Sequence, residues 1–206
     1  MLNNEITKIV FATHNKGKVD EVREILLSLG LSVLSADEAG VIEDVVEDGT
    51  TFEENAVKKA EFVGRKTGEW TIADDSGVCV EALDGAPGIY SARWAGENAS
   101  GDQWVEKILS EMKDIPEGKR RAWFETAAVL YSPKGEYWFF NGKVYGRIAF
   151  ESHGTAHPKL PYDTVFIPDG YDKTFAEMSN EEKNSISMRK IAFEKLREFL
   201  LSIKNS

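Results

Sequence analysis

The sequence predicts an α/β fold: a single domain, residues 1–206, with a central mixed β-sheet and flanking helices. Strand-like and helix-like segments alternate in the first part of the chain, which favours parallel strands joined by helices. Two β-rich segments in the middle, 122–131 and 137–150, are joined by Ser-Pro-Lys-Gly and are typical of a hairpin. No repeat or long linker divides the chain. We therefore expect one domain with a cleft between two lobes.

The first elements follow from the hydrophobic pattern. Residues 8–13 form a predicted strand, and the polar segment 14–18 follows it. Apolar residues then recur at helical spacing over 19–29, which predicts a helix that Gly30 ends.

The next elements surround a pair of aspartates. Thr51 is the expected N-cap of a second helix, with Glu54 completing a capping box. A strand over 70–73 is expected to lead into an Asp-rich turn, 74–77, and a second short strand over 78–83.

Helices are also predicted in the later part of the chain. One covers about 102–112, and another lies at the end of the chain, where apolar residues from Ala192 to Ile203 share one face. Ser179 and Glu182 predict another capping box, which places Lys183 in a first helical turn.

Composition excludes several classes of protein. The chain has 25 Lys and Arg against 35 Asp and Glu, a net charge of −10, which argues against a general nucleic-acid binder. No apolar run reaches the roughly 18–20 residues that span a bilayer, and we expect no secretory signal and no membrane partner. Cys79, the single cysteine, excludes an internal disulfide and reads as a core residue. We therefore expect a cytoplasmic protein.

The segment Thr13–Lys18 lies between a strand end and a helix start, where backbone N–H groups and the helix dipole bind anions. Thr13 and Asn15 would add hydrogen bonds, Lys16 and Lys18 positive charge, and Gly17 close access to the backbone. The sequence is not a Walker A loop. The alternative is a solvated loop with two surface lysines.

Adjacent carboxylates at Asp74 and Asp75 could hold Mg²⁺ and orient or deprotonate a water, or could simply form a turn. Glu47 could add a ligand from an acidic loop, or that loop could be merely solvated. Lys59 falls seven residues after Phe52, on the apolar stripe of its helix, so its side chain must snorkel, pair, or meet a buried anion.

Seven motifs in order resemble the inosine/xanthosine triphosphate pyrophosphatase family over nearly the whole chain, from about Ile9 to Leu200. They are Thr-x-Asn-x-x-Lys (13–18), TFEENA (51–56), IADDSG (72–77), GAPGIYSARWAG (85–96), YGRI (145–148), and PDGYDKTFAEMSNEEKN (168–184) followed by Ser-x-Arg (187–189). Each motif alone is weak, but IADDSG with GAPGIYSAR at this spacing is specific.

The resemblance implies an elongated α/β fold, a cleft between lobes and a homodimer. It also implies Mg²⁺-dependent hydrolysis of aberrant purine nucleoside triphosphates (ITP, dITP, XTP) to the monophosphate and pyrophosphate. Two alternatives stay open: a sister pyrophosphatase for modified pyrimidine or methylated nucleotides, and a purine nucleotide-binding protein that does not hydrolyse its ligand.

By position, the resemblance also implies roles for single residues. Asp75 would be the proton acceptor, with Lys18 as its catalytic partner, and Glu47 and Asp75 would bind Mg²⁺. Whether Asp74 or Asp75 is the working base is left open. The substrate-binding residues would be Thr13, His14, Asn15, Lys16, Gly17, Lys18, Lys59, Ser76, Leu160, Pro161, Tyr162, Asp163, Lys183, Met188 and Arg189.

Two departures from the family pattern concern the base. Leu160-Pro161 stands where the family usually has Phe-Gly, which removes an aromatic ring for stacking. Met188 stands where the family usually has His, which removes an imidazole donor. Arg189, which can only donate, would match the C6 oxygen of hypoxanthine and xanthine and oppose the amino group of adenine.

Overall fold

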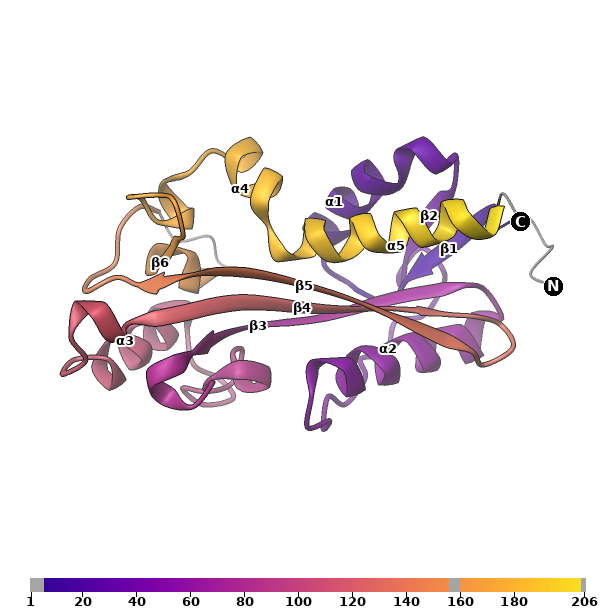
Figure 1. Cartoon of the computed structure of the whole chain (residues 1–206). Coiled ribbons are helices and arrows are strands. Elements are labelled where there is room, and N and C mark those ends of the chain that lie inside the picture. The colour runs from indigo at the N-terminus through magenta and orange to yellow at the C-terminus, as the bar shows by residue number, and fades with distance from the viewer. Residues whose placement is uncertain (1–5, 156–159, 205–206) are drawn as a thin grey trace. The chain divides into compact units, whose positions relative to one another are not determined.

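The structure is a computed structural model that describes residues 6–155 and 160–204. Its helices and strands are β1 Lys8–Phe11, α1 Lys16–Leu26, β2 Ser32–Ser35, α2 Phe52–Thr67, β3 Thr71–Val80, α3 Gly101–Glu111, β4 Arg121–Tyr131, β5 Tyr137–Ile148, β6 Phe166–Pro168, α4 Asn180–Ile186 and α5 Met188–Lys204. Figure 1 shows these elements along the chain.

The strands form one sheet in the order β2-β1-β3-β4-β5-β6. Strand β1 pairs in parallel with β2 and β3, whereas β5 pairs antiparallel with β6. The predicted α/β fold with a mixed sheet is therefore confirmed. The chain divides into two compact units: unit 1 contains Met1–Asp75, Thr126–Gly142 and Arg189–Ser206, and unit 2 contains Ser76–Glu125 and Lys143–Met188.

In unit 1, alternate residues of β1 face opposite sides of the sheet. Ile9 and Phe11 are buried in a cluster with the apolar residues of α1 and α5. Val10 and Ala12 are buried in a second cluster, with those of α2. Figure 1 shows the same arrangement, with α1 and α5 on one face of β1 and α2 on the other.

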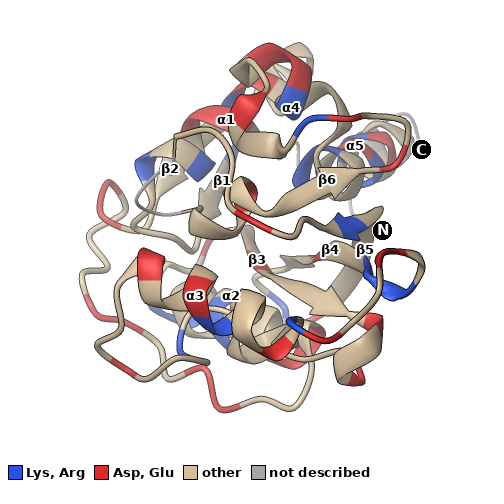
Figure 2. Ribbon diagram, turned by 90° about the vertical axis from the view of Figure 1, so that its left-hand side faces the viewer, with Lys and Arg blue, Asp and Glu red and all other residues tan. Residues whose placement is uncertain are grey.

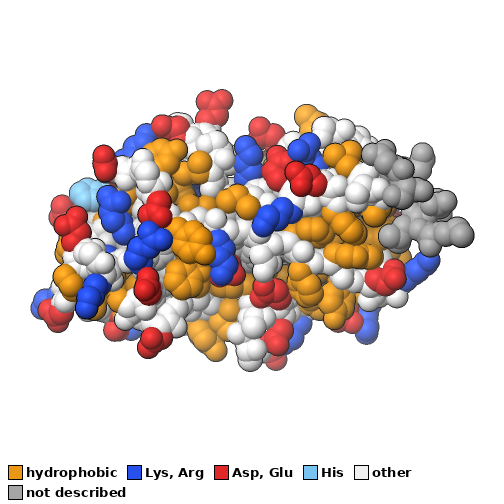
Figure 3. All heavy atoms as spheres, in the orientation of Figure 1, with side chains coloured by type: hydrophobic (Ala, Val, Ile, Leu, Met, Phe, Trp, Pro, Cys, Tyr) orange, Lys and Arg blue, Asp and Glu red, His pale blue; other side chains and the backbone are white. Residues whose placement is uncertain are grey.

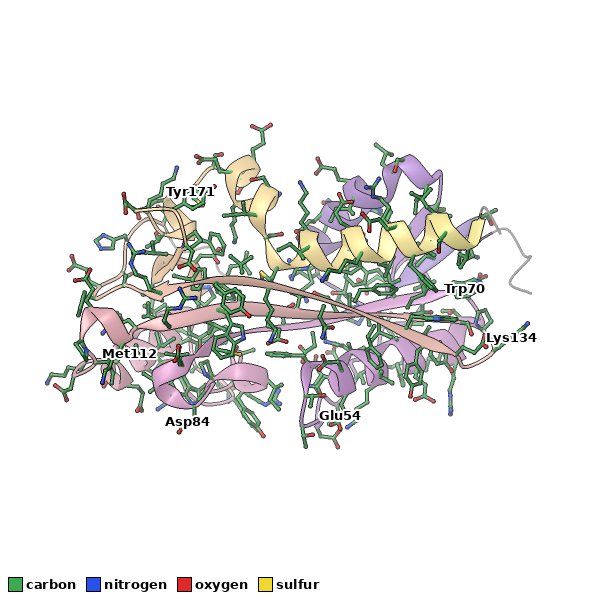
Figure 4. The ribbon with its side chains drawn as sticks, viewed as in Figure 1. Glu54, Trp70, Asp84, Met112, Lys134 and Tyr171 are labelled. Atoms are coloured by element: carbon green, nitrogen blue, oxygen red, sulfur yellow. The ribbon has the colours of Figure 1, made fainter. Side chains whose placement is uncertain are left out.

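Unit 2 has its own core. Met112, at the end of α3 (Figure 4), is fully buried among apolar residues of β3, β4 and β6. Helix α3 begins one residue before the predicted start, after a capping box formed by Ser100 and Gln103. Burial raises the pKa of Cys79 to about 12, which confirms that this thiol is a core residue.

The predicted caps of two helices are confirmed, with one difference. Thr51 Oγ1 accepts a hydrogen bond from the Glu54 backbone at the start of α2, but the Glu54 carboxylate accepts from Thr50, one residue before the cap. Figure 4 labels Glu54 at this end of α2. The capping box of Ser179 and Glu182 is complete and begins α4, but Lys183 lies in the last turn of this short helix and not in the first turn that the sequence predicts.

The predicted turn at 74–77 is wrong, because β3 runs through it without a break from Thr71 to Val80. Two aspartates can lie inside a buried strand only when cations compensate their charge. Lys18 and Lys59 supply these cations. No strand was expected at β2 or β6, which are only 4 and 3 residues long and depend on pairing with β1 and β5.

Over residues 6–155 and 160–204, no helix has the length and apolar character that crossing a membrane requires. Figure 3 shows Lys and Arg interspersed with Asp and Glu and with small apolar areas on the face that it presents.

Candidate functional site

The segment after β1 forms a hydrogen-bonded cap at the N-terminus of α1. Asn15 is the N-cap, and its side-chain oxygen accepts from the backbone N–H groups of Gly17 and Lys18, at 3.1 and 3.4 Å. Thr13 Oγ1 accepts from the backbone N–H of Asn15. The helix thus begins three residues before its apolar pattern, so Lys16 and Lys18 lie in its first turn, where the dipole favours an anion. A Cβ at Gly17 would meet Asn15 Oδ1 at 3.4 Å, so the fold alone does not require glycine there.

His14 lies beside this cap and is held by acidic residues. Its Nδ1 is 2.8 Å from Asp37 Oδ1, and Nε2 is 3.7 Å from Asp44. The hydrogen bond with Asp37, and the charges of Asp37 and Asp44, raise the pKa of His14 above 6.5. Next to it is a pocket of about 190 Å³, lined by His14, Lys16, Val19, Arg23, Ser35, Asp37 and Glu38.

The first aspartate of the pair, Asp74, is fully buried and bound by two cations. Lys18 Nζ lies 2.9 and 3.0 Å from its two oxygens, and Arg189 Nε lies 3.1 Å from Oδ2. Arg189 is also buried, and its Nη1 lies 2.9 Å from Glu21 Oε2. Lys18, Asp74, Arg189 and Glu21 therefore form one chain of ion pairs inside unit 1, buried at Asp74 and Arg189 and partly exposed at its two ends.

The charges in this chain determine the protonation of its members. Burial alone would raise the pKa of Asp74, but Lys18 and Arg189 outweigh it and hold that pKa far below its usual range. Burial is the main cause that lowers the pKa of Lys18, and Asp74 opposes it. Asp74 is thus a fixed anion that positions cations, and it is a poor proton acceptor.

The second aspartate, Asp75, lies in a different environment. Its Oδ2 accepts a hydrogen bond of 3.0 Å from Asn55 Nδ2, and Lys59 Nζ lies 3.6 Å from its Oδ1. Burial raises the pKa of Asp75, and the negative charge of Glu47 raises it further, while Lys59 and Asn55 act in the opposite direction. A carboxylate with a raised pKa is suited to accept a proton.

Glu47 reaches Asp75 from the loop before α2. Lys59 Nζ lies 3.3 Å from Glu47 Oε2 as well, so one ammonium lies between the two carboxylates. The Lys59 side chain is only 13% exposed. Of the alternatives open for this lysine, the structure therefore shows pairing with the buried Asp75 and the partly exposed Glu47 rather than snorkelling.

Two further contacts hold the loop to α2. Asn55 is fully buried, and its Oδ1 accepts from the backbone N–H of Gly49 at 2.8 Å, so it links the loop to Asp75. Lys58 forms an ion pair with Asp48. Figure 2 shows basic positions on the ribbon of α2 in blue.

The donor set fits a magnesium ion. Glu47 and Asp75 offer carboxylate oxygens that share the Lys59 ammonium, and Mg²⁺ is usually bound by one or two carboxylates together with substrate phosphates and water. Among the described residues there is no group of three or more His, Cys, Asp or Glu that could hold a metal by themselves.

Unit 2 contains the residues expected at the base. Tyr162 is buried, donates to the Ser91 carbonyl at 2.9 Å and stacks on Trp104 at 6.0 Å between ring centres. Pro161 is buried beside Gly101, where a Cβ on the glycine would lie 2.9 Å from the proline ring. Glycine at the start of α3 therefore makes room for this proline.

Other predicted base contacts differ in exposure. Asp163 and Lys183 form a buried ion pair. Leu160 is 36% exposed and Ser76 half-buried on β3, whereas Met188 is only 6% exposed and packs in the apolar core of unit 2. The Met188 side chain thus fills the core of this unit.

The structure brings the predicted phosphate and metal residues together in unit 1: Thr13 to Lys18, Glu47, Lys59, Asp75 and also Arg189. Ser76, Leu160 to Asp163, Lys183 and Met188 lie in unit 2. Asn55 and Glu21 did not emerge from the sequence. A signal for Asn55 existed, since it follows Phe52 by three residues and so lies on the apolar face of α2.

Comparisons with known proteins identify the family of this chain. The model of the Ham1 family matches residues 9–199. A dITP/XTP pyrophosphatase of Porphyromonas gingivalis is 44% identical, over 96% of this chain and 99% of that protein. One of Zymomonas mobilis is 46% identical, over 92% of this chain and 90% of that protein.

Two solved structures of Ham1 proteins have a fold similar to that of this chain. The Ham1 protein of Staphylococcus aureus has a TM-score of 0.86 at 39% identity, covering 95% of this chain and 99% of its own. A HAM1 protein of Coxiella burnetii has a TM-score of 0.87 at 34% identity, covering 95% and 98%. With its sequence matched from strand β1 to helix α5 and its fold matched at these scores, this chain belongs to the Ham1 family.

Proposed function

We propose that this chain hydrolyses aberrant purine nucleoside triphosphates, ITP, dITP and XTP, to the nucleoside monophosphate and pyrophosphate. The relatives named dITP/XTP pyrophosphatase support this substrate class. The observation that carries the proposal is the arrangement in unit 1. Two adjacent aspartates have opposite pKa shifts, and both are paired with lysines, one of which lies in the first turn of an anion-binding helix.

The proposed reaction is an attack by water on the α-phosphorus. The new bond joins the water oxygen to this phosphorus, the bond to the bridging oxygen breaks, and pyrophosphate leaves with that oxygen. Asp75 accepts the proton of the water, because it faces one ammonium at 3.6 Å, whereas Asp74 is bound by both Lys18 and Arg189. The cap around Asn15 and the lysines Lys18 and Lys59 hold the phosphates and oppose their charge.

We propose Mg²⁺ as the divalent cation and Glu47 and Asp75 as its protein ligands. When bound there, a cation of this kind supplies charge stabilisation to the phosphate oxygens. Both carboxylates already share the Lys59 ammonium, which supports a cation-binding role for this pair.

Some of the predicted residues are proposed contacts of the base or the ribose. Asp163, Lys183 and the segment Leu160–Tyr162 are proposed base or ribose contacts, with Ser76 as a further substrate contact. Arg189 already pairs with Asp74 and Glu21, so its contact with a base stays a prediction. The buried position of Met188 does not favour a direct contact with the base.

Three further properties belong to the same proposal. The chain would act as one catalytic domain, form a homodimer and work in the cytoplasm, where nucleoside triphosphates are used. Light scattering on the purified protein tests the dimer.

Pyrophosphate release from ITP, with Mg²⁺ and with a chelator, tests the function. We expect release with Mg²⁺ only. Hydrolysis of modified pyrimidine or methylated nucleotides in preference to ITP would favour the sister activity. Tight binding of ITP without any release of pyrophosphate would favour a nucleotide-binding protein.

A further inference from the structure

The ammonium of Lys59 lies where the two proposed metal ligands meet. It is 3.3 Å from Glu47 Oε2 and 3.6 Å from Asp75 Oδ1. The side chains of Lys59 and Asp75 are 13% and 12% exposed, so water screens the charges of these two groups poorly, whereas the Glu47 side chain is 35% exposed. One positive charge thus faces one buried and one partly exposed negative charge.

The contacts of Lys59 are looser than those of the neighbouring lysine. Lys18 lies 2.9 and 3.0 Å from the oxygens of Asp74, close to the distance of about 2.7–2.9 Å that is typical of a charge-assisted hydrogen bond. Lys59 is farther from both of its partners. It is held mainly by charge, and its flexible four-carbon stem allows the ammonium to move.

The charge of Lys59 also acts on the ion pairs that Asp74 forms with Lys18 and Arg189. Burial is the main cause that lowers the pKa of Lys18, and the charges of Arg189 and Lys59 lower it further. Lys59 likewise helps Lys18 and Arg189 to lower the pKa of Asp74. The charge of Lys59 therefore acts on the carboxylates of Glu47 and Asp75 and also on Lys18 and Asp74.

We propose that Lys59 is the internal counter-ion of the Glu47–Asp75 pair, and that it leaves this pair for the substrate phosphates when a divalent cation binds. The inference rests on the proposed function for the identity of the phosphate ligand. Both carboxylates could hold a divalent cation, which would take the place of the Lys59 ammonium and repel it.

The consequence is a coupling between two ligands. Lys59 competes with the cation for the carboxylates, so the cation binds the nucleotide-free protein more weakly than the carboxylates alone would allow. Once displaced, the ammonium is available to the phosphates, so cation and nucleotide each favour the binding of the other.

The test measures cation binding without nucleotide. Lys59→Met keeps the length of the side chain and removes the competing charge, so Mn²⁺ measured by electron paramagnetic resonance, and Mg²⁺ measured by calorimetry, should bind at least about tenfold more tightly. Lys58→Met is the matched control, because Lys58 precedes Lys59 and pairs with Asp48 on the same loop. Its cation affinity should equal that of the wild type.

A second readout is thermal. Without metal, Lys59→Met leaves two carboxylates facing each other, so Mg²⁺ should raise its Tm by more than it raises the Tm of the wild type. Lys59→Gln serves as a second variant if the Met protein does not fold. At saturating Mg²⁺ the variant should show a raised KM for ITP.

Cation binding to Lys59→Met that is equal to or weaker than in the wild type overturns the proposal. So does a Tm response to Mg²⁺ no larger than that of the wild type. Failure of the proposed function looks different: the wild type would not hydrolyse ITP, while the cation affinity would still rise in the variant.

Discussion

Asp74 and Asp75 are neighbours in β3, yet replacing each by Asn should have opposite effects on stability. Asp74 is fully buried between Lys18 and Arg189, whose side chains are 23% and 8% exposed. Asp74→Asn keeps the shape and leaves two cations without their shared anion. Removing one partner of a buried ion pair costs about 3–5 kcal/mol, and because Asn still accepts hydrogen bonds we expect about 3 kcal/mol. For a protein of this size that lowers Tm by about 6–12 °C.

Asp75→Asn should not destabilise the protein. The pKa of Asp75 is raised in the folded state, mainly by burial, so its ionised form opposes folding at neutral pH. A neutral amide removes that cost, and Lys59 keeps Glu47 as a partner. We therefore expect an unchanged or higher free energy of unfolding together with a collapse of turnover.

The pH dependence gives an independent check. The pKa of Asp74 is lowered in the folded state, so its contribution is fully present above the unfolded value of about 3.9 and is lost as the pH falls below it. The difference between wild type and Asp74→Asn should be constant from about pH 5 to 7 and shrink below about pH 4. Urea unfolding followed by tryptophan fluorescence measures it. Equal stability of the wild type and Asp74→Asn at pH 7 would refute the reasoning.

Three more outcomes are expected. Asn55→Ala removes the hydrogen-bond partner that Asn55 provides to the buried Gly49 N–H and to a carboxylate oxygen of Asp75. It should lower the free energy of unfolding by about 2 kcal/mol, measured by urea unfolding. It should also lower kcat more than it raises KM, measured by steady-state kinetics. The His14 pKa, measured by NMR titration, should lie above 6.5 and fall in Asp37→Asn. The stabilisation from the His14–Asp37 pair is present below pH 6.5 and fades as the pH rises through the folded pKa. An unchanged His14 pKa in the variant would contradict this pairing. In kcat/KM, ITP and XTP should exceed ATP and GTP, and equal values for ITP and ATP would remove the base-recognition argument.

Local features of the fold could be predicted from the sequence, because neighbours along the chain determine them. The caps at Thr51 and Ser179 depend on residues only three positions away. Strands β2 and β6 could not be predicted, because pairing with β1 and β5 stabilises them rather than a hydrophobic pattern of their own.

The same division applies to the site. The sequence indicates phosphate and metal chemistry through residue types, and the structure brings these residues together in unit 1. The sequence could not predict which aspartate is suited to accept a proton, because the partners of Asp74 are remote along the chain. Lys18 is 56 positions away and Arg189 is 115 positions away. These cations also explain why β3 continues where a turn was expected.

In the proposed reaction, Asp75 directs a water to the α-phosphorus of ITP. Hydrolysis in water enriched in the heavy oxygen isotope, with mass spectrometry of both products, measures where this water oxygen goes. We expect the label only in the nucleoside monophosphate, and we expect Asp75→Asn to slow its appearance by at least about 10²-fold while the protein stays folded. Label in the pyrophosphate, or turnover by Asp75→Asn close to that of the wild type, would contradict it.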